Sequence, residues 1–299
     1  MFKFLYSSTS LYTAKIYALA WLCCLSFSTV RAQQTVDSCR YTSLLPEIDK
    51  FVHETSSTSR LTQRQWLWGI GGISLLDTYL SPLTYKGMNL CFVHQTERKA
   101  RRLGKSLTLH SFYSGHFDYT QSPTEDGKNL DAELTAAGSL LHNFTLAPQW
   151  RLGLGGTLEG SSGFTYNTRG SNNPAQGRLG ISLAASALLE YRFSFIRQRA
   201  TARLQADAQV AGVQFSPQFG QSYYEIFSLG HSDGVVHFTH PGNCPSIRLQ
   251  ALVTLPIKSA RLTLGYLSDI RQSKLGNLKR HAWRNNFVIG YTRRLHIVH

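Results

Sequence analysis

The sequence has few charged residues for its length. Asp, Glu, Lys and Arg make up 16% of the 299 residues, against about 25% in an average soluble domain. Acidic residues are the scarcer group, with 17 against 31 Lys and Arg, so the formal net charge is +14. This balance is unusual for a water-soluble domain, and the 42% hydrophobic content excludes a disordered chain.

Long apolar runs and cysteines are scarce as well. The sequence has no run of about 18 consecutive apolar residues, the length that a membrane-spanning helix needs. Five cysteines in 299 residues exclude a disulfide-dense mini-domain. Cys39, Cys91 and Cys244 lie beyond the N-terminal signal described next, and this odd number permits one disulfide and one free thiol without deciding the pairing.

The N-terminus has the features of an export signal. Lys3 and Lys15 precede the apolar stretch 16–27, and the small residues Val30 and Ala32 precede Gln33. This order of basic, apolar and small residues is typical of a secretory signal peptide. We therefore expect a signal peptide at 1–32, an N-terminal periplasmic extension at 33–64, and an exported domain of a Gram-negative bacterium at 65–299.

Alternation of apolar and polar residues with period two dominates the sequence from residue 65 onward. The pattern predicts about ten strands (8–12), many as long as the ~9–11 residues with which a tilted strand crosses a bilayer. They lie at 65–77, 87–98, 105–119, 130–144, 149–160, 178–195, 202–212, 247–255, 261–269 and 283–295. Short connections alternate with longer ones at 78–87, 121–129, 161–177, 214–243 and 272–279. We predict an all-β fold, a closed antiparallel up-and-down transmembrane β-barrel.

Alternation alone does not decide which face of the sheet is turned outward. It also fits a soluble barrel or sandwich with an apolar core. Two features of the strands favour a membrane barrel: the polar face carries Arg, Ser, Thr and paired acids while Lys lies outside the strands or at their ends, and aromatic residues lie near strand ends. We therefore expect the apolar face, with Leu152, Leu183, Leu204 and Ile289, to contact lipid.

The polar face would then fill a narrow lumen. By parity, the side chains expected in this lumen network are Arg151, Glu159, Arg178, Glu190, Arg192, Arg203, Asp207, Arg248, Arg261, Asp269, Arg284 and Arg294. Arginine and carboxylate groups form compact, hydrogen-bonded pairs. We expect a plugged interior rather than a wide pore.

One segment carries a resemblance to a known group. Asp77–Gly87, after the glycine-rich Gly69–Gly72, resembles an uncharacterised outer-membrane-barrel family of Bacteroidetes, a domain of unknown function. The junction Val30–Gln34 is similar to the export junctions of that group. The resemblance implies an outer-membrane β-barrel and supplies neither an activity nor site residues.

Candidate chemistry is limited to a possible site at the barrel rim. His116 and Asp118 share a polar face near a strand end, and His231 and Asp233 lie in the long segment 214–243. If they met, the arrangement would look somewhat like the mouth of the omptin proteases, where a water between His and carboxylates performs hydrolysis. The omptin Asp-x-Asp and Asp-x-His spacings are absent, so we interpret these four residues as structural.

The expected function is that of an outer-membrane barrel with a structural, binding or narrow-transport role and no enzymatic activity. We expect no cofactor and no metal site. The expected partners are outer-membrane lipid, the barrel assembly machinery and an unidentified extracellular ligand, with no nucleic acid, because Arg is spread over the chain without a basic stripe. Two alternatives stay open: a barrel-borne hydrolase, and a soluble periplasmic barrel that binds an apolar ligand.

Overall fold

The computed structural model describes residues 60–100, 104, 106–170, 174–196, 198–257 and 260–297. The predicted signal peptide, Cys39 and most of the predicted extension lie outside these residues. Strand β1 begins at Arg60, before the expected boundary at residue 65. Within the described residues, no helix is both long enough and apolar enough to cross a membrane.

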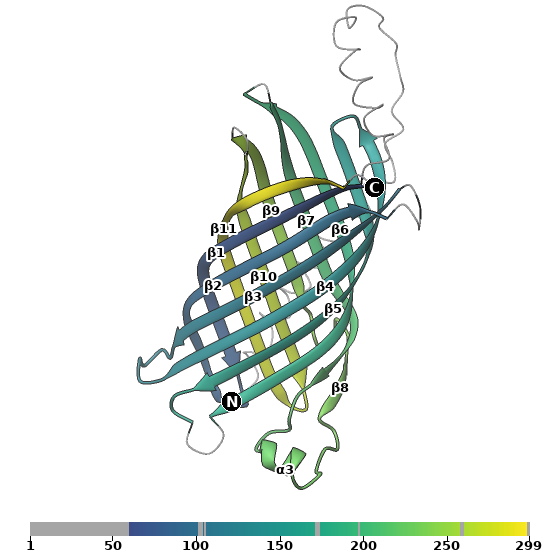
Figure 1. Cartoon of the computed structure of the whole chain (residues 1–299). Helices are drawn as coiled ribbons and strands as arrows, with labels where there is room; N and C mark the ends of the chain where they lie inside the picture. The colour runs from purple at the N-terminus through teal and green to yellow at the C-terminus, as the bar shows by residue number, and fades with distance from the viewer. Residues whose placement is uncertain are drawn as a thin grey trace, which may run out of the picture. The chain divides into compact units, whose positions relative to one another are not determined.

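The described chain consists almost entirely of long strands (Figure 1). The elements in chain order are β1 (Arg60–Asp77), β2 (Ser81–Lys99), β3 (Leu107–Gln121), β4 (Lys128–Ala147), β5 (Trp150–Asn167), β6 (Ala175–Phe195), β7 (Gln198–Phe215), α3 (Tyr223–Phe227), β8 (Val236–Thr239), β9 (Ile247–Ile257), β10 (Ala260–Leu275) and β11 (Leu278–Ile297).

Ten of the strands close into a barrel. The sheet order is β6-β5-β4-β3-β2-β1-β11-β10-β9-β7-β8, and an additional pairing of β6 with β7 joins its ends. Every pairing is antiparallel. The short strand β8 adds to the end of β7, where Val236–Thr239 pairs with Gly212–Phe215. The prediction of a closed antiparallel barrel with ten strands is confirmed.

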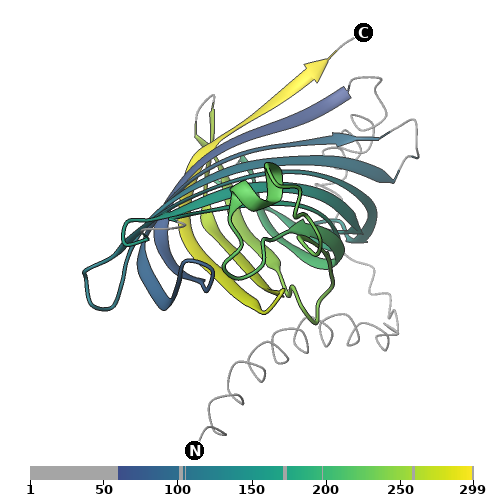
Figure 2. The same cartoon turned by 90° about the horizontal axis from the view of Figure 1, so that it is seen from below.

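The connections differ at the two ends of the barrel. Arg60 pairs with Ile297, so the described chain begins and finishes at one end, which we call the terminus end. The other end, the loop end, carries the longest connection, residues 216–246 between β7 and β9, which contains α3 and β8. Figures 1 and 2 show α3 at this loop end.

Several predicted loops are shorter than the sequence indicated. Residues 81–87 belong to β2 rather than to a loop, because they pair with the end of β1. The expected loop 272–279 is a two-residue turn in which Gly276 and Asn277 have φ values of 51° and 64°. Positive φ at both central residues is the geometry of a tight hairpin turn, and Gly and Asn are the residues that adopt it most readily.

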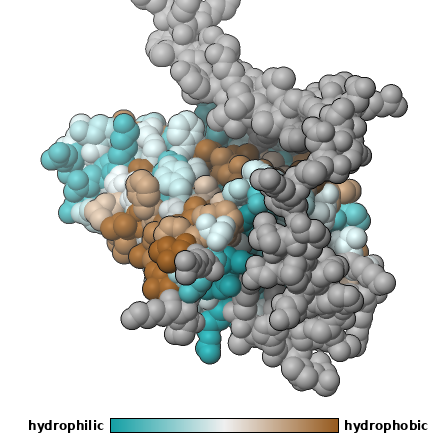
Figure 3. All heavy atoms as spheres, turned by 90° about the horizontal axis from the view of Figure 1, so that it is seen from above, coloured by the Kyte–Doolittle hydropathy of each residue, from teal (hydrophilic) through white to brown (hydrophobic). Residues whose placement is uncertain are grey.

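The two faces of the barrel wall have opposite chemistry. Leu183, Leu204 and Ile289 point outward with 53%, 52% and 54% of their surface exposed, whereas Arg284 points inward and is fully buried. Leu152 is half-buried. Seen from above, hydrophobic side chains gather on the visible flank of the barrel (Figure 3). The structure thus has an apolar outer surface around a charged interior.

Candidate functional site

The charged side chains inside the barrel form two groups. The first, which we call the terminus-end cluster, consists of Glu97, Glu190, Arg151, Arg192 and Arg203. Arg151 lies 2.8 Å from Glu97 and 2.7 Å from Glu190. Arg203 also pairs with Glu97, at 2.8 Å, and Arg192 pairs with Glu190 at 2.9 Å. Each carboxylate of this cluster therefore faces two guanidinium groups.

The second group, the central network, lies nearer the loop end. Its members are Asp77, Asp118, Asp131, Glu133, Glu159, Asp207 and Asp269 with Arg178, Arg248, Arg271, Arg280 and Arg284. Most of these side chains alternate with apolar ones along their strands, and the period of two turns them inward.

Arg284 is the most enclosed member of the central network. Its Nε donates to Asp118 at 2.8 Å, Nη2 to Asp131 at 2.8 Å and Nη1 to Glu133 at 3.1 Å. Asp118 also accepts a hydrogen bond from Asn89 Nδ2 at 2.5 Å. A guanidinium with three carboxylate partners holds β11, β3 and β4 in one fixed arrangement.

Most of these ion pairs cross the lumen. Arg248 of β9 bonds to Glu159 of β5 at 2.6 Å, and Arg271 of β10 bonds to the same carboxylate at 2.5 Å. Arg203 of β7 reaches Glu97 of β2. None of these strand pairs is adjacent in the sheet. The side chains therefore bridge opposite walls and obstruct the path through the barrel.

Neutral side chains fill the lumen toward the terminus end. Gln65 Nε2 donates to the hydroxyls of Thr263 and Thr292, each at 2.9 Å. Next to this layer lies a buried apolar cluster that includes Leu67, Phe112 and Val288. The guanidinium of Arg248 lies 4.0 Å from the centre of the Phe112 ring. An ion that crosses this apolar cluster would lose its hydration, which makes the passage of ions through the lumen costly.

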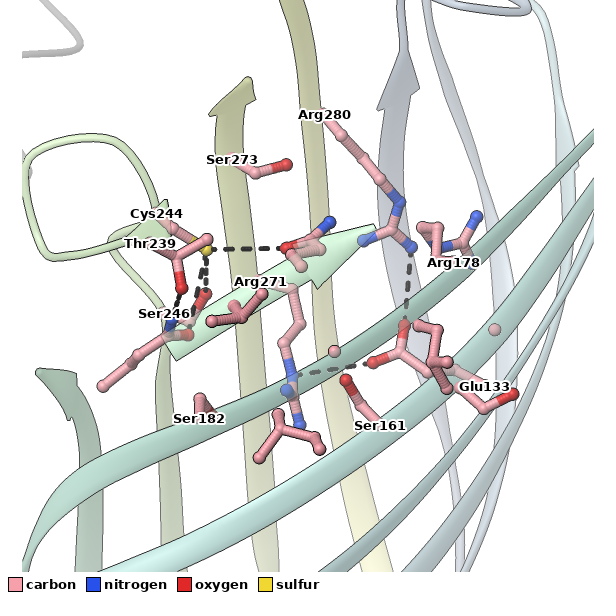
Figure 4. Close-up of a pocket in the computed structure, with 18 of the residues that line it drawn as sticks. Glu133, Ser161, Arg178, Ser182, Thr239, Cys244, Ser246, Arg271, Ser273 and Arg280 are labelled. Atoms are coloured by element: carbon pink, nitrogen blue, oxygen red, sulfur yellow. Dashed lines mark hydrogen bonds and ion pairs between the residues drawn. The ribbon is translucent and has the colours of Figure 1, made fainter. Parts of the chain in front are cut away.

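A small cavity of about 50 Å³ lies at the loop end of the lumen (Figure 4). Arg178, Arg271, Arg280 and Glu133 line it on one side, and Thr239, Cys244 and several serines line the other. Pockets for drug-sized ligands have volumes of about 300–1,000 Å³. This cavity has room for a few water molecules.

Residues 216–246, which we call the cap segment, lie across the loop end. The hydroxyl of Tyr79, in the β1–β2 turn, donates to the carbonyl of Gln221 at 2.7 Å. Burial is the main cause that raises the pKa of Tyr79 to about 12, so this hydroxyl stays protonated and able to donate. Because β1 and β7 are not neighbours, this bond ties the cap segment to the far side of the opening.

A second tether joins α3 to the end of β6. Tyr223 Oη accepts a hydrogen bond from the Gly177 amide at 2.5 Å and donates to the Gly177 carbonyl at 3.3 Å. Ser222 and Glu225 form a reciprocal capping box at the start of α3. The pairing of β6 with β7 ends at Leu179, so the backbone amide and carbonyl of Gly177 have no partner on β7. The Tyr223 hydroxyl supplies that partner.

Removing the Tyr223 hydroxyl should loosen the cap segment. We expect Tyr223→Phe to lower the free energy of local opening by about 1 kcal/mol, the usual contribution of one hydrogen bond. Hydrogen exchange of amides 216–235 should then be roughly fivefold faster. Tyr224→Phe is the matched control, because Tyr224 is exposed and its hydroxyl makes no hydrogen bond within the described chain. Equal exchange rates in the two variants would contradict the tether.

The four candidate rim residues do not come together. His116 and Asp118 are buried inside the barrel, where His116 lies 3.8 Å from Asp269 and Asp118 bonds to Arg284. His231 and Asp233 are exposed in the cap segment, and their backbone carbonyls accept hydrogen bonds from Gln221 and Gln218. Within the described residues, no hydrogen bond or ion pair links one pair to the other.

The residues expected in the lumen lie as follows. Arg151, Glu190, Arg192 and Arg203 belong to the terminus-end cluster, and Glu159, Arg178, Asp207, Arg248, Asp269 and Arg284 to the central network. Arg261 is half-buried near the start of β10 and belongs to neither group. The side chain of Arg294 lies outside the described part of the structure.

Sequence reasoning missed four of the nine carboxylates in these two groups and placed a fifth, Asp118, at the rim. Asp131 and Glu133 lie two residues apart on β4, and their shared parity was the available signal. Arg280 was missed because its strand was expected to begin at 283, whereas β11 begins at Leu278. Asp77 and Glu97 lie near strand ends, where parity cannot distinguish a lumen position from a rim position.

Neither thiol of the described chain is arranged for catalysis. Cys91 and Cys244 are both free and buried. Burial is the main cause that raises the pKa of the Cys244 thiol, which opposes the thiolate form that a nucleophile requires. Across the described ranges, no group of three or more His, Cys, Asp or Glu is placed to hold a metal ion.

Comparisons with known proteins give a family and a set of distant barrels. No curated protein matches the chain. Among solved structures, it is similar to the outer membrane protease OmpT from Escherichia coli, with 8% identity, TM-score 0.44, and coverage of 81% of this chain and 100% of that one. It is also similar to the translocator domain of the autotransporter NalP from Neisseria meningitidis, with 11% identity, TM-score 0.39, and coverage of 83% and 97%.

A third similar structure is Ail, the attachment invasion locus protein of Yersinia pestis, with 13% identity, TM-score 0.29, and coverage of 77% and 98%. At these values none of the three indicates a role for this chain. A family model described as "Protein of unknown function (DUF3316)" matches residues 17–299. The match covers most of the sequence, and the chain therefore belongs to this family of unknown function.

Proposed function

We propose that this protein is an integral outer-membrane β-barrel whose own side chains close its lumen, and that it acts as a structural or binding component of the cell envelope rather than as an enzyme. The observation that carries this proposal is the distribution of side chains across the barrel wall, with ion pairs bridging the inside and large apolar residues exposed outside.

The outer surface supports the membrane location. Leu134, Leu158, Ile181 and Phe287 are all more than half exposed, and they belong to four different strands. Exposing such a side chain to water forgoes about 1.5–3 kcal/mol of burial free energy. An apolar surface that continues around a closed sheet is what a bilayer accommodates, because the closed sheet leaves no backbone group unpaired.

The bacterial outer membrane is the location we propose, with delivery by the signal peptide expected at residues 1–32. Outer-membrane lipid and the barrel assembly machinery are then the partners during insertion, and the loop end is the surface for an extracellular ligand. The resemblance of Asp77–Gly87 to a Bacteroidetes barrel family supports the same location and remains a prediction about the source.

The membrane proposal is tested by heat-modifiable migration. A closed barrel in detergent should migrate faster in an SDS gel before boiling than after it, and the full-length protein should fractionate with outer membranes. Recovery in the soluble periplasmic fraction with no shift on boiling would overturn the proposal in favour of a soluble barrel.

The closed lumen is tested by electrical recording. The purified protein in a planar bilayer should produce no steady open-pore current, because the bridging pairs and the layer around Phe112 obstruct the barrel. Regular steps of conductance in every insertion would show an open passage and would overturn the closed-lumen proposal.

The alternative of a barrel-borne hydrolase gains no support from the geometry. It requires His116 and Asp118 to act with His231 and Asp233, and these pairs have separate partners in the structure. Peptidase or lipase turnover that disappears in Asp118→Asn and His231→Ala would reverse this conclusion.

A further inference from the structure

We propose that the cap segment extends the lipid-contacting surface of the barrel, with α3 and β8 lying against the membrane rather than projecting into water. This inference rests on the proposed membrane location. The occupant that we assign to the exposed apolar face of the cap segment is the lipid layer at the loop end.

Phe215 connects this face to the outer wall of the barrel. It is the last residue of β7, and it pairs with Leu179 of β6 on one side and with Val236 of β8 on the other. Its ring centre lies 6.2 Å from that of Phe227 in α3. Apolar side chains thus continue without a break from the outer wall to the cap segment.

The cap segment turns its apolar side chains outward. On β8, Thr239 is buried and accepts a hydrogen bond from Gln209, whereas Val236 and Phe238 are 62% and 64% exposed. On α3, Phe227 is 72% exposed. Since alternate residues of a strand point to opposite sides, β8 has one face toward the barrel interior and one apolar face without a partner in the described structure.

The charges of the cap segment fit a lipid-contacting position. Residues 216–246 contain no Lys or Arg, although the whole chain has 31. Their only acidic residues are Glu225 and Asp233. Glu225 is occupied in the capping box, where the Ser222 backbone amide and hydroxyl hold the pKa of its carboxyl below the usual range. A segment with so little charge loses little hydration on contact with a membrane.

The other long connections at the same end differ in this respect. The connection between β3 and β4 contains Glu125 and Asp126, and the one between β5 and β6 contains Arg169, which pairs with Asp126 at 2.7 Å. These groups are solvent-exposed. The barrel therefore presents a charged rim on one side and an apolar rim on the side of β6, β7 and β8.

The tethers fix which side of the cap segment is free. Tyr79, in the β1–β2 turn, bonds to the backbone of the cap segment at Gln221. Tyr223, within the cap segment, bonds to the backbone of β6 at Gly177. The aromatic rings of Phe227 and Phe238 are consequently left on the outer side. Large exposed aromatic residues beside a lipid-facing wall are typical of the membrane interface.

Photo-crosslinking tests the assignment with little change to the side chains. The variants are Phe227→p-benzoylphenylalanine and Phe238→p-benzoylphenylalanine in the full-length protein, reconstituted in phosphatidylcholine vesicles that contain an alkyne-tagged acyl chain. After irradiation, we expect tagged lipid on the protein at both positions. Phe164→p-benzoylphenylalanine, on the outer face of β5, is the lipid-facing control, and Glu125→p-benzoylphenylalanine is the solvent control.

The outcomes separate this inference from the proposed function. Lipid adducts at 227 and 238 that match those at 164 and exceed those at 125 support the inference. Adducts at 164 alone overturn it while leaving the membrane barrel intact, and so does a crosslinked dimer at 227 or 238 in place of lipid, which would identify a second copy as the occupant. Absence of lipid adducts at 164 overturns the membrane location itself.

Discussion

Arg284→Met is expected to lower the free energy of unfolding of the barrel by about 3–5 kcal/mol. Arg284 is fully buried, and its three donor nitrogens lie within 3.1 Å of Asp118, Asp131 and Glu133. Methionine fills similar space without a charge. Three carboxylates would then lie close together inside the barrel without their principal cation, and it is this repulsion that destabilises the fold. Urea unfolding in detergent micelles, followed by tryptophan fluorescence, measures the change.

A surface pair provides the control for Arg284. Arg169 pairs with Asp126 at 2.7 Å, but its side chain is 52% exposed. We expect Arg169→Ala to change the unfolding free energy by no more than about 1 kcal/mol, since exposed pairs contribute little. In the double variant Arg284→Met with Asp118→Asn, part of the loss should be recovered, because Arg284 is the ion-pair partner of Asp118 in the described structure and the substitution removes the charge that is left without it. A loss below about 1 kcal/mol in Arg284→Met would show that the central network does not depend on this residue.

Gly71→Ala is expected to destabilise the barrel by roughly 3 kcal/mol or to prevent its assembly. A Cβ atom at Gly71 would lie 1.8 Å from the backbone oxygen of Asn285 on β11. Backbone on the neighbouring strand cannot rotate away as a side chain can, so the β1–β11 pairing must shift. This pairing joins the first and last strands of the barrel, and its disruption opens the sheet. The fraction of heat-modifiable protein after refolding measures the effect.

Gly160→Ala is the matched control for Gly71. Gly160 lies on the outward face of β5, and a Cβ atom there meets no other atom within 4 Å. The same chemical change should therefore alter stability by no more than about 0.5 kcal/mol. If both variants refold equally well, the close approach of β1 and β11 does not limit the fold.

The strands were predictable because period two is a local property of the chain. In β4, apolar and polar residues alternate from Asn129 to Ala136 in the sequence just as exposed and buried residues do in the structure. Boundaries were less accurate, because β2 and β11 extend over segments whose sequence resembles loops. There, pairing with β1 and β10 supplies backbone hydrogen bonds that the local sequence does not reveal.

The sequence alone determined that ten two-faced strands exist and that arginine and carboxylate groups share one of the faces. Only the tertiary structure decided which charges meet. Arg284 is 153 residues from Asp131 and on a strand that does not pair with β4. Contacts across a lumen depend on strand order, stagger and curvature, and these arise from the closure of the whole sheet. The cap segment followed the same rule, because its place at the opening depends on Tyr79 and Gly177 in distant strands and turns.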